Sequence, residues 1–306
     1  MIARVRGTLS GGGGKTPYDR PLLAYLFILP GFAVYALFVL VPIVGTVRYS
    51  FYQWTGFSPP TFIGLDNYRA LLKDDFFINA LGNNFYFILF YTVLPILLGL
   101  FLTSLLARSR LRGMTIFRVG LFLPQVLSPV VVGIIWRWIF AHDGPINEFL
   151  AVVGLDGWVR PWLGDFDWAP RAAGAVGTWV EYGLCLVLFI AGVQAIEEDL
   201  YDAAKVDGAN AAQQFRHITL PGLRQQILVA FVVTFIAALR VFGMVFVLTR
   251  GGPGQETQVV SMLIYDQAFR FRQAGYSTAM AVVLSVIIIG VSALALYGQG
   301  RRERGA

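Results

Sequence analysis

Two ionisable residues, Glu181 and Arg240, lie deep inside long apolar segments of the sequence. A charge without a partner is costly in hydrocarbon, so such residues are functional candidates by default. In the topology derived below, a helical rise of about 1.5 Å per residue puts both groups roughly 21–23 Å from the inner membrane face. At that depth they could form an ion pair, line one polar cavity together, or leave Arg240 to extend toward the membrane surface.

Three amides occupy similar apolar surroundings: Gln125, Asn83 and Asn84. An amide in a membrane span either contacts a polar solute in a pathway or hydrogen-bonds between helices. The remaining reactive groups are too separated for an enzyme, because His142 and His217 fall on opposite membrane sides in this topology. Cys185 sits inside an apolar run and is expected to be a small packing residue. We therefore expect neither a metal site nor a catalytic site in this chain.

The apolar segments that hold these residues define the class of protein. The chain has 306 residues, of which 57% are hydrophobic and 14% are charged, and its mean hydropathy is +0.65. Soluble domains carry about a quarter charged residues. Six segments are apolar and long enough, at roughly 20 residues, to cross the hydrocarbon core as helices. Their expected cores are 22–47, 84–106, 119–140, 172–195, 227–249 and 277–299. The expected fold class is an all-α membrane protein with six transmembrane helices.

The distribution of Lys and Arg sets the expected orientation. With the N-terminus in the cytoplasm, the inner segments contain fourteen of the 24 basic residues and the outer segments nine, spread over longer loops. This bias predicts two cytoplasmic termini and explains the net charge without a nucleic-acid partner. We expect a flexible N-terminus at 1–20, a membrane domain at 21–300 and a tail at 301–306. Gly14-Lys15-Thr16 lacks the preceding glycine of a phosphate-binding loop, so ATP binding by this chain is not expected.

A polar segment at about 197–225 separates the fourth and fifth spans. Its acidic start, Glu197-Glu198-Asp199, suits the positive end of a helix dipole, and Asp207-Gly208 suits a left-handed helix end. Pro221 then stops a second short helix. We expect two amphipathic helices around a Gly208 hinge at the cytoplasmic mouth of the bundle. On composition alone, an ordinary amphipathic loop and a contact surface for another subunit explain this segment equally well.

The spacing in this segment resembles the E-A-A-x3-G-x9-I-x-L-P signature of permease subunits in bacterial ABC importers. The matching positions are Ala203, Ala204, Gly208, Ile218, Leu220 and Pro221, and Asp202 stands at the first position. The resemblance implies a coupling helix that sits in a groove of a cytoplasmic ATPase and transmits nucleotide-driven motion. Asp202 departs from the usual Glu and carries its charge on a shorter side chain, and Gln225 stands where a further proline is common. Asp207 offers a second carboxylate to a basic partner.

Flanking passages are similar to the carbohydrate branch of this family, typified by maltose and glycerol-phosphate permeases. They lie at 62–68, 122–124, 136–138, 200–204 and 247–254. The resemblance extends over about 22–299 and implies import of a sugar or oligosaccharide across the bacterial cytoplasmic membrane. The implied partners are a second permease subunit, expected to be a different chain, two ATPase subunits that hold ATP and Mg²⁺, and an extracytoplasmic substrate-binding protein. The chain itself is expected to have no cofactor and no enzymatic activity.

Three alternatives are considered beside a sugar importer. A permease for glycerol phosphate or another polar anionic solute would suit Arg240. A secondary transporter driven by ions would be expected to carry inverted repeats and more intramembrane carboxylates than Glu181 alone. A structural scaffold or channel subunit would leave 197–225 unexplained. Under the importer hypothesis Arg240 faces the translocation path and hydrogen-bonds sugar hydroxyls or a phosphate, and Glu181 and the three amides are further candidates for the path.

Overall fold

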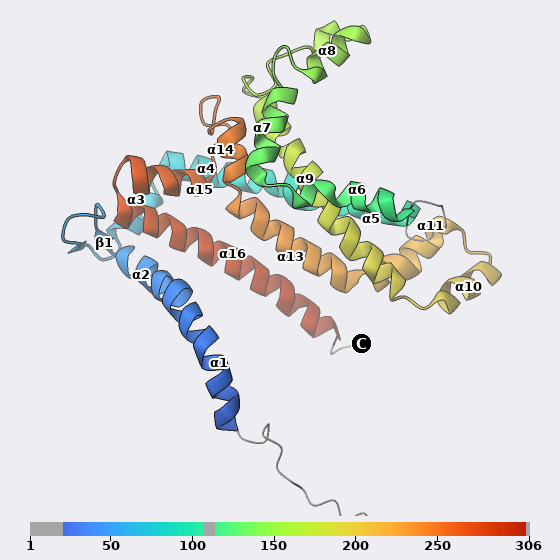
Figure 1. Ribbon diagram of the computed structural model, residues 1–306, viewed down its shortest axis with the longest axis horizontal. Coiled ribbons are helices and arrows are strands. Elements are labelled where there is room, and N and C mark those ends of the chain that lie inside the picture. Colours follow the sequence, from blue (N-terminus) through green and yellow to red (C-terminus); the bar gives the residue numbers. More distant parts are fainter. Residues whose placement is uncertain (1–20, 107–113, 304–306) are drawn as a thin grey trace, which may run out of the picture. The chain divides into compact units, whose positions relative to one another are not determined.

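The computed structural model describes residues 21–106 and 114–303, which the ribbon in Figure 1 follows along the chain. The expected flexible segment at 1–20 and the end of the tail at 301–306 lie outside the described residues. The chain divides into two compact units, Met1–Arg48 and Tyr49–Ala306. Among the described residues the structure is helical apart from one two-stranded sheet, which confirms the expected fold class.

The first unit contains an apolar helix that confirms the first expected span. Its segments are α1 (Pro21–Tyr35), the π-helical segment η2 (Ala36–Leu40) and α2 (Val41–Tyr49). The stretch Tyr25–Tyr49 is long and apolar enough to cross a bilayer. Pro42 is tolerated because the wide π turn directly before it releases the carbonyl that a proline cannot bond.

The second unit begins with a small strand pair and a short helix. The strands are β1 (Tyr52–Gln53) and β2 (Thr61–Phe62), which pair antiparallel. The helix is α3 (Asp66–Leu71). The buried Asn67 joins the two, because its Nδ2 donates to the carbonyl oxygens of Ser50 at 2.9 Å and Tyr52 at 3.0 Å.

The second span is one long helix that starts earlier than expected. Its segments are α4 (Asp75–Ile88), η3 (Leu89–Val93) and α5 (Leu94–Leu106). The helix begins at Asp75 rather than near 84 because Asp74 caps it: one carboxylate oxygen accepts from the N–H groups of Phe76 at 2.9 Å and Phe77 at 3.3 Å. Because the first turn is polar, a search for apolar segments does not detect this start of the helix.

The third span is broken rather than straight. Its two parts are α6 (Met114–Val126) and α7 (Pro129–Ile139). They meet at 104°. Pro129 lacks an N–H and disfavours helical geometry at the preceding residue, and Ser128 accordingly has an extended ψ of 135°.

The loop after α7 folds around a cation–π cluster. It carries α8 (Pro145–Val152) and the short 3₁₀ helix η4 (Asp156–Trp158). Trp158, Trp162 and Trp168 surround Arg160, whose guanidinium carbon lies 4.6 to 5.4 Å from their ring centroids. These contacts give the tryptophans a packing role within the loop.

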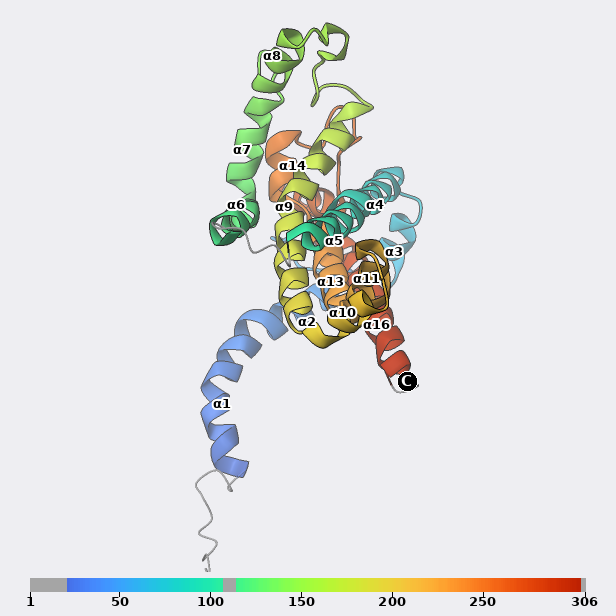
Figure 2. The ribbon, with the colours of Figure 1, turned by 90° about the vertical axis from the view of Figure 1, so that its right-hand side faces the viewer.

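The fourth span, α9 (Trp168–Gln194), is the most enclosed candidate span, with 61% of its apolar window buried. It packs against α5, α6 and the fifth span, and Figure 2 shows it beside α5. Gly177 permits close approach, because a Cβ there would overlap the ring of Tyr91. Cys185 is fully buried against Gly99 of α5, which confirms its expected packing role.

The fifth span also breaks. It consists of α13 (Arg224–Arg240) and, after a two-residue gap, α14 (Gly243–Leu248), where a continuous helix over 227–249 was expected. Asn84 stabilises this break, since its Nδ2 donates to the carbonyl oxygens of Ala238 at 3.1 Å and Leu239 at 3.2 Å. Those carbonyls would otherwise accept from backbone N–H groups in the next turn.

The last elements complete the set of spans. They are α15 (Val260–Tyr265), η6 (Asp266–Arg270) and α16 (Ala274–Glu303). α16 contacts α13, and both ribbon views show the two helices alongside each other. The described residues thus hold four single helices that could cross a membrane, or six spans if each of two bent pairs counts as one: Val119–Val126 with Pro129–Ile139, and Ala211–Gly222 with Arg224–Arg240.

Candidate functional site

The polar segment between α9 and α13 begins with a tightly terminated helix. α10 (Glu198–Val206) has Glu198 and Asp199 in its first turn, which suits the helix dipole. At its end the N–H of Gly208 donates to Lys205 O at 3.1 Å, and the N–H of Ala209 donates to Ala204 O at 2.8 Å. This pair of bonds is a Schellman motif, and Gly208 adopts its left-handed conformation with φ 78°. The expected left-handed helix end at Gly208 is therefore confirmed, and its role as a hinge stays a prediction.

A second helical stretch follows immediately. It comprises α11 (Ala211–Gln214), the π-helical η5 (Phe215–Thr219) and α12 (Leu220–Gly222). Asn210 and Gln213 start it with a capping box: Asn210 Oδ1 accepts from the Gln213 N–H, and Gln213 Oε1 accepts from the Asn210 N–H. The stretch passes through Pro221 instead of stopping there, because the π turn before Pro221 accommodates its missing N–H. A 67° bend then leads into α13.

Two contacts fix this loop to the membrane helices. Leu223 is fully buried and lies against Gly192 of α9, where a Cβ would come within 2.5 Å of it. Ile196 packs on Gly222 in the same way. Both ends of the loop are therefore packed where it joins α9 and α13.

One buried hydrogen bond joins the two short helices. The hydroxyl groups of Tyr201 and Thr219 lie 2.9 Å apart, and both residues are almost fully buried. Neither residue belongs to the signature, and sequence reasoning missed both. The sequence signal was weak. Tyr201 lies near the start of the first amphipathic stretch, and Thr219 lies near the end of the second.

The signature residues divide between an exposed and a packed set. Asp202 and Ala203 are exposed, and Asp202 pairs with Lys205 at 2.7 Å on the surface, where such a pair contributes little. Ile218, Leu220 and Pro221 are half-buried beneath them. Val206 is 89% exposed beside them although it is apolar. The arrangement therefore presents charged and apolar groups together on one short, rigid helix.

The two intramembrane charges are not paired. Glu181 is buried in α9, whereas Arg240 is exposed at the end of α13. Within the described residues, no ion pair or hydrogen bond joins these two side chains. The ion-pair alternative is thus not realised in this structure, and roles in a solute path stay predictions.

The three candidate amides differ in what they bond. Asn83 Nδ2 donates to the carbonyl oxygens of Gln255 at 2.8 Å and Gln258 at 2.9 Å. Asn84 is fully buried and, besides its bonds to α13, accepts from the Val260 N–H at 2.9 Å. Both asparagines therefore connect segments far apart in sequence. Gln125 Oε1 is buried and has no hydrogen-bond partner among the described residues.

Comparison with known proteins gives consistent similarities. Residues 95–302 match the family described as binding-protein-dependent transport system inner membrane component. The chain is 37% identical to the probable ABC transporter permease protein YurN of Bacillus subtilis (strain 168), over 92% of this chain and 98% of that protein. It is 32% identical to the diacetylchitobiose uptake system permease protein NgcF of Streptomyces coelicolor, over 95% and 88% respectively. A solved bacterial ABC transporter involved in the import of the acidic polysaccharide alginate aligns with a TM-score of 0.79 and 26% identity, covering 92% of this chain and 96% of that one.

Proposed function

The chain belongs to the family of binding-protein-dependent transport system inner membrane components, and on this premise we propose that it is the transmembrane subunit of an ATP-driven importer for a sugar or oligosaccharide. It forms half of a translocation pore. A separate ATPase holds ATP and Mg²⁺, closes on the nucleotide and moves the loop between α9 and α13. The chain itself is a transport subunit and not an enzyme.

The anchored loop is the observation that carries this proposal. α10 displays Asp202 and Ala203 outward, while Leu223 and Ile196 fix the loop to the ends of α9 and α13. A rigid helix on the surface that is packed onto two spans can transmit a push from another subunit to the pore. An unattached amphipathic loop would lack these buried contacts.

The substrate class rests on the relatives. NgcF is named for diacetylchitobiose uptake, and the solved transporter imports alginate, so both are associated with saccharides. The proposed complex contains this chain, a second and different permease subunit, two ATPase subunits and an extracytoplasmic substrate-binding protein. It lies in the bacterial cytoplasmic membrane with both termini of this chain in the cytoplasm.

The solute path is proposed to include Arg240. Its guanidinium is exposed at the end of α13, next to the break in the fifth span. Such breaks in membrane helices are tolerated where they are buried in protein or line a water-filled cavity. Glu181 and Gln125 are proposed to contribute polar groups to the same path. Asn83 and Asn84 are proposed to position the backbone segments beside the path to which they are hydrogen-bonded.

An anionic solute is the second candidate. Arg240 has no acidic partner among the described residues, and the solved relative imports an acidic polysaccharide. A guanidinium binds carboxylate and phosphate groups in bidentate geometry, which favours a uronic-acid saccharide or a sugar phosphate.

Vesicle transport tests the proposal. The complete complex is reconstituted with ATP inside and the binding protein outside, and uptake of radiolabelled neutral and acidic oligosaccharides is measured. We expect uptake that needs both ATP and binding protein and that is insensitive to collapse of proton and sodium gradients. Uptake driven by an ion gradient without ATP would reject the proposal in favour of a secondary transporter.

A further inference from the structure

Four aromatic rings form a continuous strip beside the break in the fifth span. They are Phe242 and Phe246, at the break and in α14, and Tyr265 and Phe269, in α15 and η6. Neighbouring ring centroids lie 5.2 to 6.0 Å apart. The strip begins directly after the end of α13 at Arg240. It therefore continues from the residue at the centre of the proposed solute path.

The spacing of these residues along the chain produces the strip. In each pair the two residues are four positions apart, which places their rings on one face of a helical segment. The backbone supports this in both pairs: the Phe246 N–H donates to Phe242 O at 2.8 Å, and η6 follows α15 without a gap. The two faces meet where the ring of Tyr265 contacts both phenylalanines of the first pair.

The strip is a surface of the chain and not a buried cluster. Phe269 is 73% exposed and Tyr265 is 38% exposed. Phe242 and Phe246 are half-buried at the edge of the core around α7 and α9. A row of exposed rings marks a surface that another group covers.

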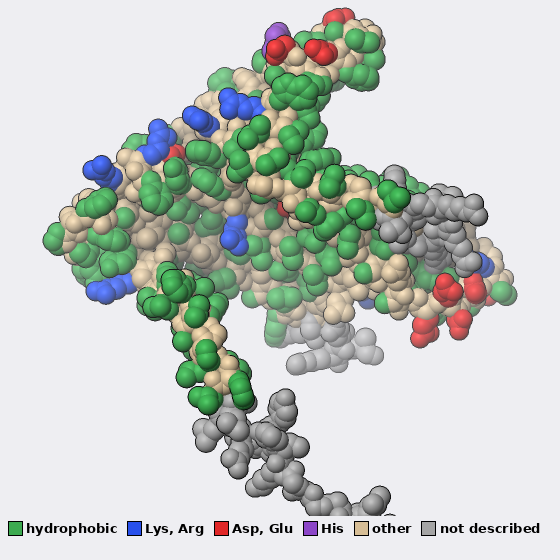
Figure 3. Space-filling view, in the orientation of Figure 1, with side chains coloured by type: hydrophobic (Ala, Val, Ile, Leu, Met, Phe, Trp, Pro, Cys, Tyr) green, Lys and Arg blue, Asp and Glu red, His purple; other side chains and the backbone are tan. Residues whose placement is uncertain are grey.

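Guanidinium groups lie at both ends of the strip. Arg240 is exposed before Phe242, and the guanidinium carbon of Arg250 lies 5.9 Å from the ring centroid of Phe246. Figure 3 shows further Lys and Arg side chains along the edge of the molecule from α3 to α14. Arg240 lies at the level of a membrane span, where a charge that faces lipid is costly, so a lipid-covered strip is disfavoured.

A sugar has the groups that match this surface. The C–H groups on the faces of a sugar ring pack on aromatic rings, and its hydroxyl groups accept from a guanidinium or bond to the Tyr265 hydroxyl. The spacing of 5.2 to 6.0 Å between the rings is close to the length of one pyranose unit in a linear oligosaccharide. Successive sugar units can therefore stack on successive rings.

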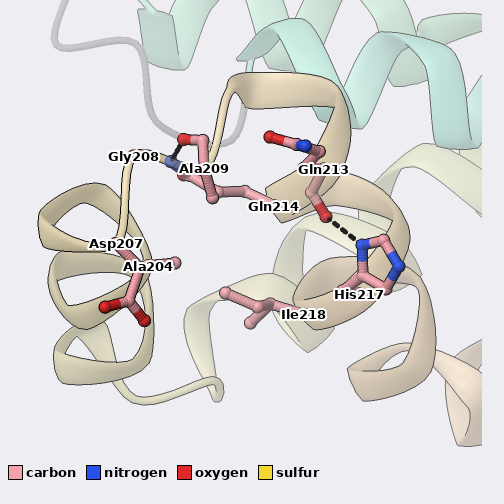
Figure 4. Close-up of a pocket in the computed structure, with 8 residues that line it drawn as sticks. All are labelled: Ala204, Asp207, Gly208, Ala209, Gln213, Gln214, His217 and Ile218. Carbon is pink, nitrogen blue, oxygen red and sulfur yellow. Dashed lines mark hydrogen bonds between the residues drawn. The ribbon is translucent and has the colours of Figure 1, made fainter.

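Two cavities of the chain lack this combination of groups. The cavity of about 330 Å³ between α10 and η5 has no Phe, Tyr or Trp among its lining residues, which are Ala204, Asp207, Gly208, Ala209, Gln213, Gln214, His217 and Ile218 (Figure 4). A cavity of about 370 Å³ between α5, α6 and α9 is lined by Trp179 and Tyr182 but by no charged residue that the structure describes. The strip offers both rings and cations.

We propose that the strip is the outer entry route for a linear oligosaccharide, whose sugar units stack in turn on the four rings on the way to Arg240. In the proposed topology, η6 and the loop after α14 face the outside. The inference rests on the proposed function. It adds the substrate class, a chain of several sugar units and not a monosaccharide or a small phosphate ester.

Uptake of saccharides of increasing length tests this route. Phe269→Leu removes a ring but keeps an apolar side chain, and Phe76→Leu is the control at a phenylalanine of α4 that is 56% exposed and lies outside the strip. In the reconstituted complex with ATP and binding protein, we expect Phe269→Leu to lower oligosaccharide uptake by about threefold to tenfold, as for loss of one stacking contact. The loss is expected to be smallest for the shortest saccharide that the wild type transports. Equal uptake by both variants at every length would overturn the inference.

A pair of substitutions at Tyr265 separates stacking from hydrogen bonding. Tyr265→Phe keeps the ring and Tyr265→Leu removes it, while both remove the hydroxyl. We expect the phenylalanine variant to transport long oligosaccharides faster than the leucine variant, and co-purification of the second permease shows that both are folded. Equal rates in these two variants would reject stacking on this ring. If the wild-type complex takes up no saccharide with ATP, the proposed function fails, and the route fails with it.

Cysteine protection locates the saccharide directly. In the Cys185→Ala background, a membrane-impermeant maleimide is applied from the outside to complexes that carry Phe269→Cys or Phe76→Cys. We expect binding protein loaded with oligosaccharide to protect position 269, binding protein without saccharide to leave it reactive, and position 76 to react equally in both cases. Protection by the empty binding protein, or no labelling of position 269 at all, would reject the route, because that protein, lipid or the second permease would then cover the strip.

Discussion

Arg240 combines two properties that set it apart from the other charges in the spans. It ends α13, where a positive charge interacts favourably with the negative end of the helix dipole. It is also exposed next to a break in the fifth span. A purely structural role would require only the positive charge, whereas solute binding in bidentate geometry would require the guanidinium itself.

Substitution of Arg240 separates these roles. Arg240→Leu is expected to lower uptake by at least about tenfold, as for loss of one charge-assisted hydrogen bond in a path, while the ATPase still co-purifies. Arg240→Lys keeps the charge and is expected to assemble with the ATPase like the leucine variant but to restore uptake only in part. Uptake in proteoliposomes is the measurement, and wild-type rates in the leucine variant would remove Arg240 from the path.

The hydrogen bonds of Asn84 illustrate what the sequence could not predict at this scale. An asparagine in an apolar helix signals either a polar path or a bond between helices, and these alternatives look identical along the chain. The deciding partners, Ala238, Leu239 and Val260, lie more than 150 residues away. The positions of the charges and amides could therefore be predicted, but their partners could not.

At the scale of elements, three π-helical segments share one cause. η2, η3 and η5 each end two residues before a proline: Pro42, Pro95 and Pro221. In each case the residue directly before the proline donates to a carbonyl five positions back, which widens the turn where the proline lacks a donor. The prolines thus produce local π turns instead of breaks, and the helices continue through them.

Close packing of α9 gives a prediction about the stability of the span bundle. At Gly177 a Cβ would overlap the ring of Tyr91, so Gly177→Ala is expected to destabilise the chain by about 1–3 kcal/mol through overpacking. At Gly290 of α16 a Cβ meets nothing within 4 Å, so Gly290→Ala is the control. The two variants are compared by thermal unfolding in detergent. Equal midpoints for both would show that α9 and η3 are not packed as described.

The bond between Tyr201 and Thr219 predicts coupling between the two loop helices. A double-mutant cycle with Tyr201→Phe and Thr219→Val is expected to give an interaction energy of about 0.5–1.5 kcal/mol, the value for a buried neutral hydrogen bond. Native-state hydrogen exchange of the α10 amides measures the free energy of local opening in each variant. Strict additivity of the two substitutions would mean that the two helices open independently of each other.

Breaks in the spans show the limit of sequence reasoning for elements. The break before Pro129 has a local cause, since proline disturbs both its own turn and Ser128, and the sequence contains that signal. The break after Arg240 has no proline and depends on the distant side chain of Asn84. The six apolar segments and the left-handed helix end at Gly208 were predictable because composition and turn chemistry are local, whereas tertiary hydrogen bonds are not.

For the whole molecule, the structure links a surface loop to the core of the membrane unit. The end of the loop packs on α9 through Leu223 and Gly192, α12 contacts α13, and α9 in turn contacts α5 and α6. The loop and the spans of the second unit are therefore connected by a continuous series of contacts. In the proposed importer, this series of contacts lets a cytoplasmic ATPase change which side of the membrane the solute path opens to.

Labelling of single cysteines tests this central claim most directly. Cys185 is the sole cysteine of the sequence and is replaced by Ala, and cysteine is then introduced at Val206 of α10 or at Val152 of α8, which are 89% and 86% exposed. A membrane-impermeant maleimide is applied to intact spheroplasts and to inside-out vesicles, with and without the bound ATPase. The account predicts that position 206 reacts only in inside-out vesicles and is protected by the ATPase, while position 152 reacts only in spheroplasts. Labelling of position 206 from the outside, or no protection by the ATPase, would contradict it.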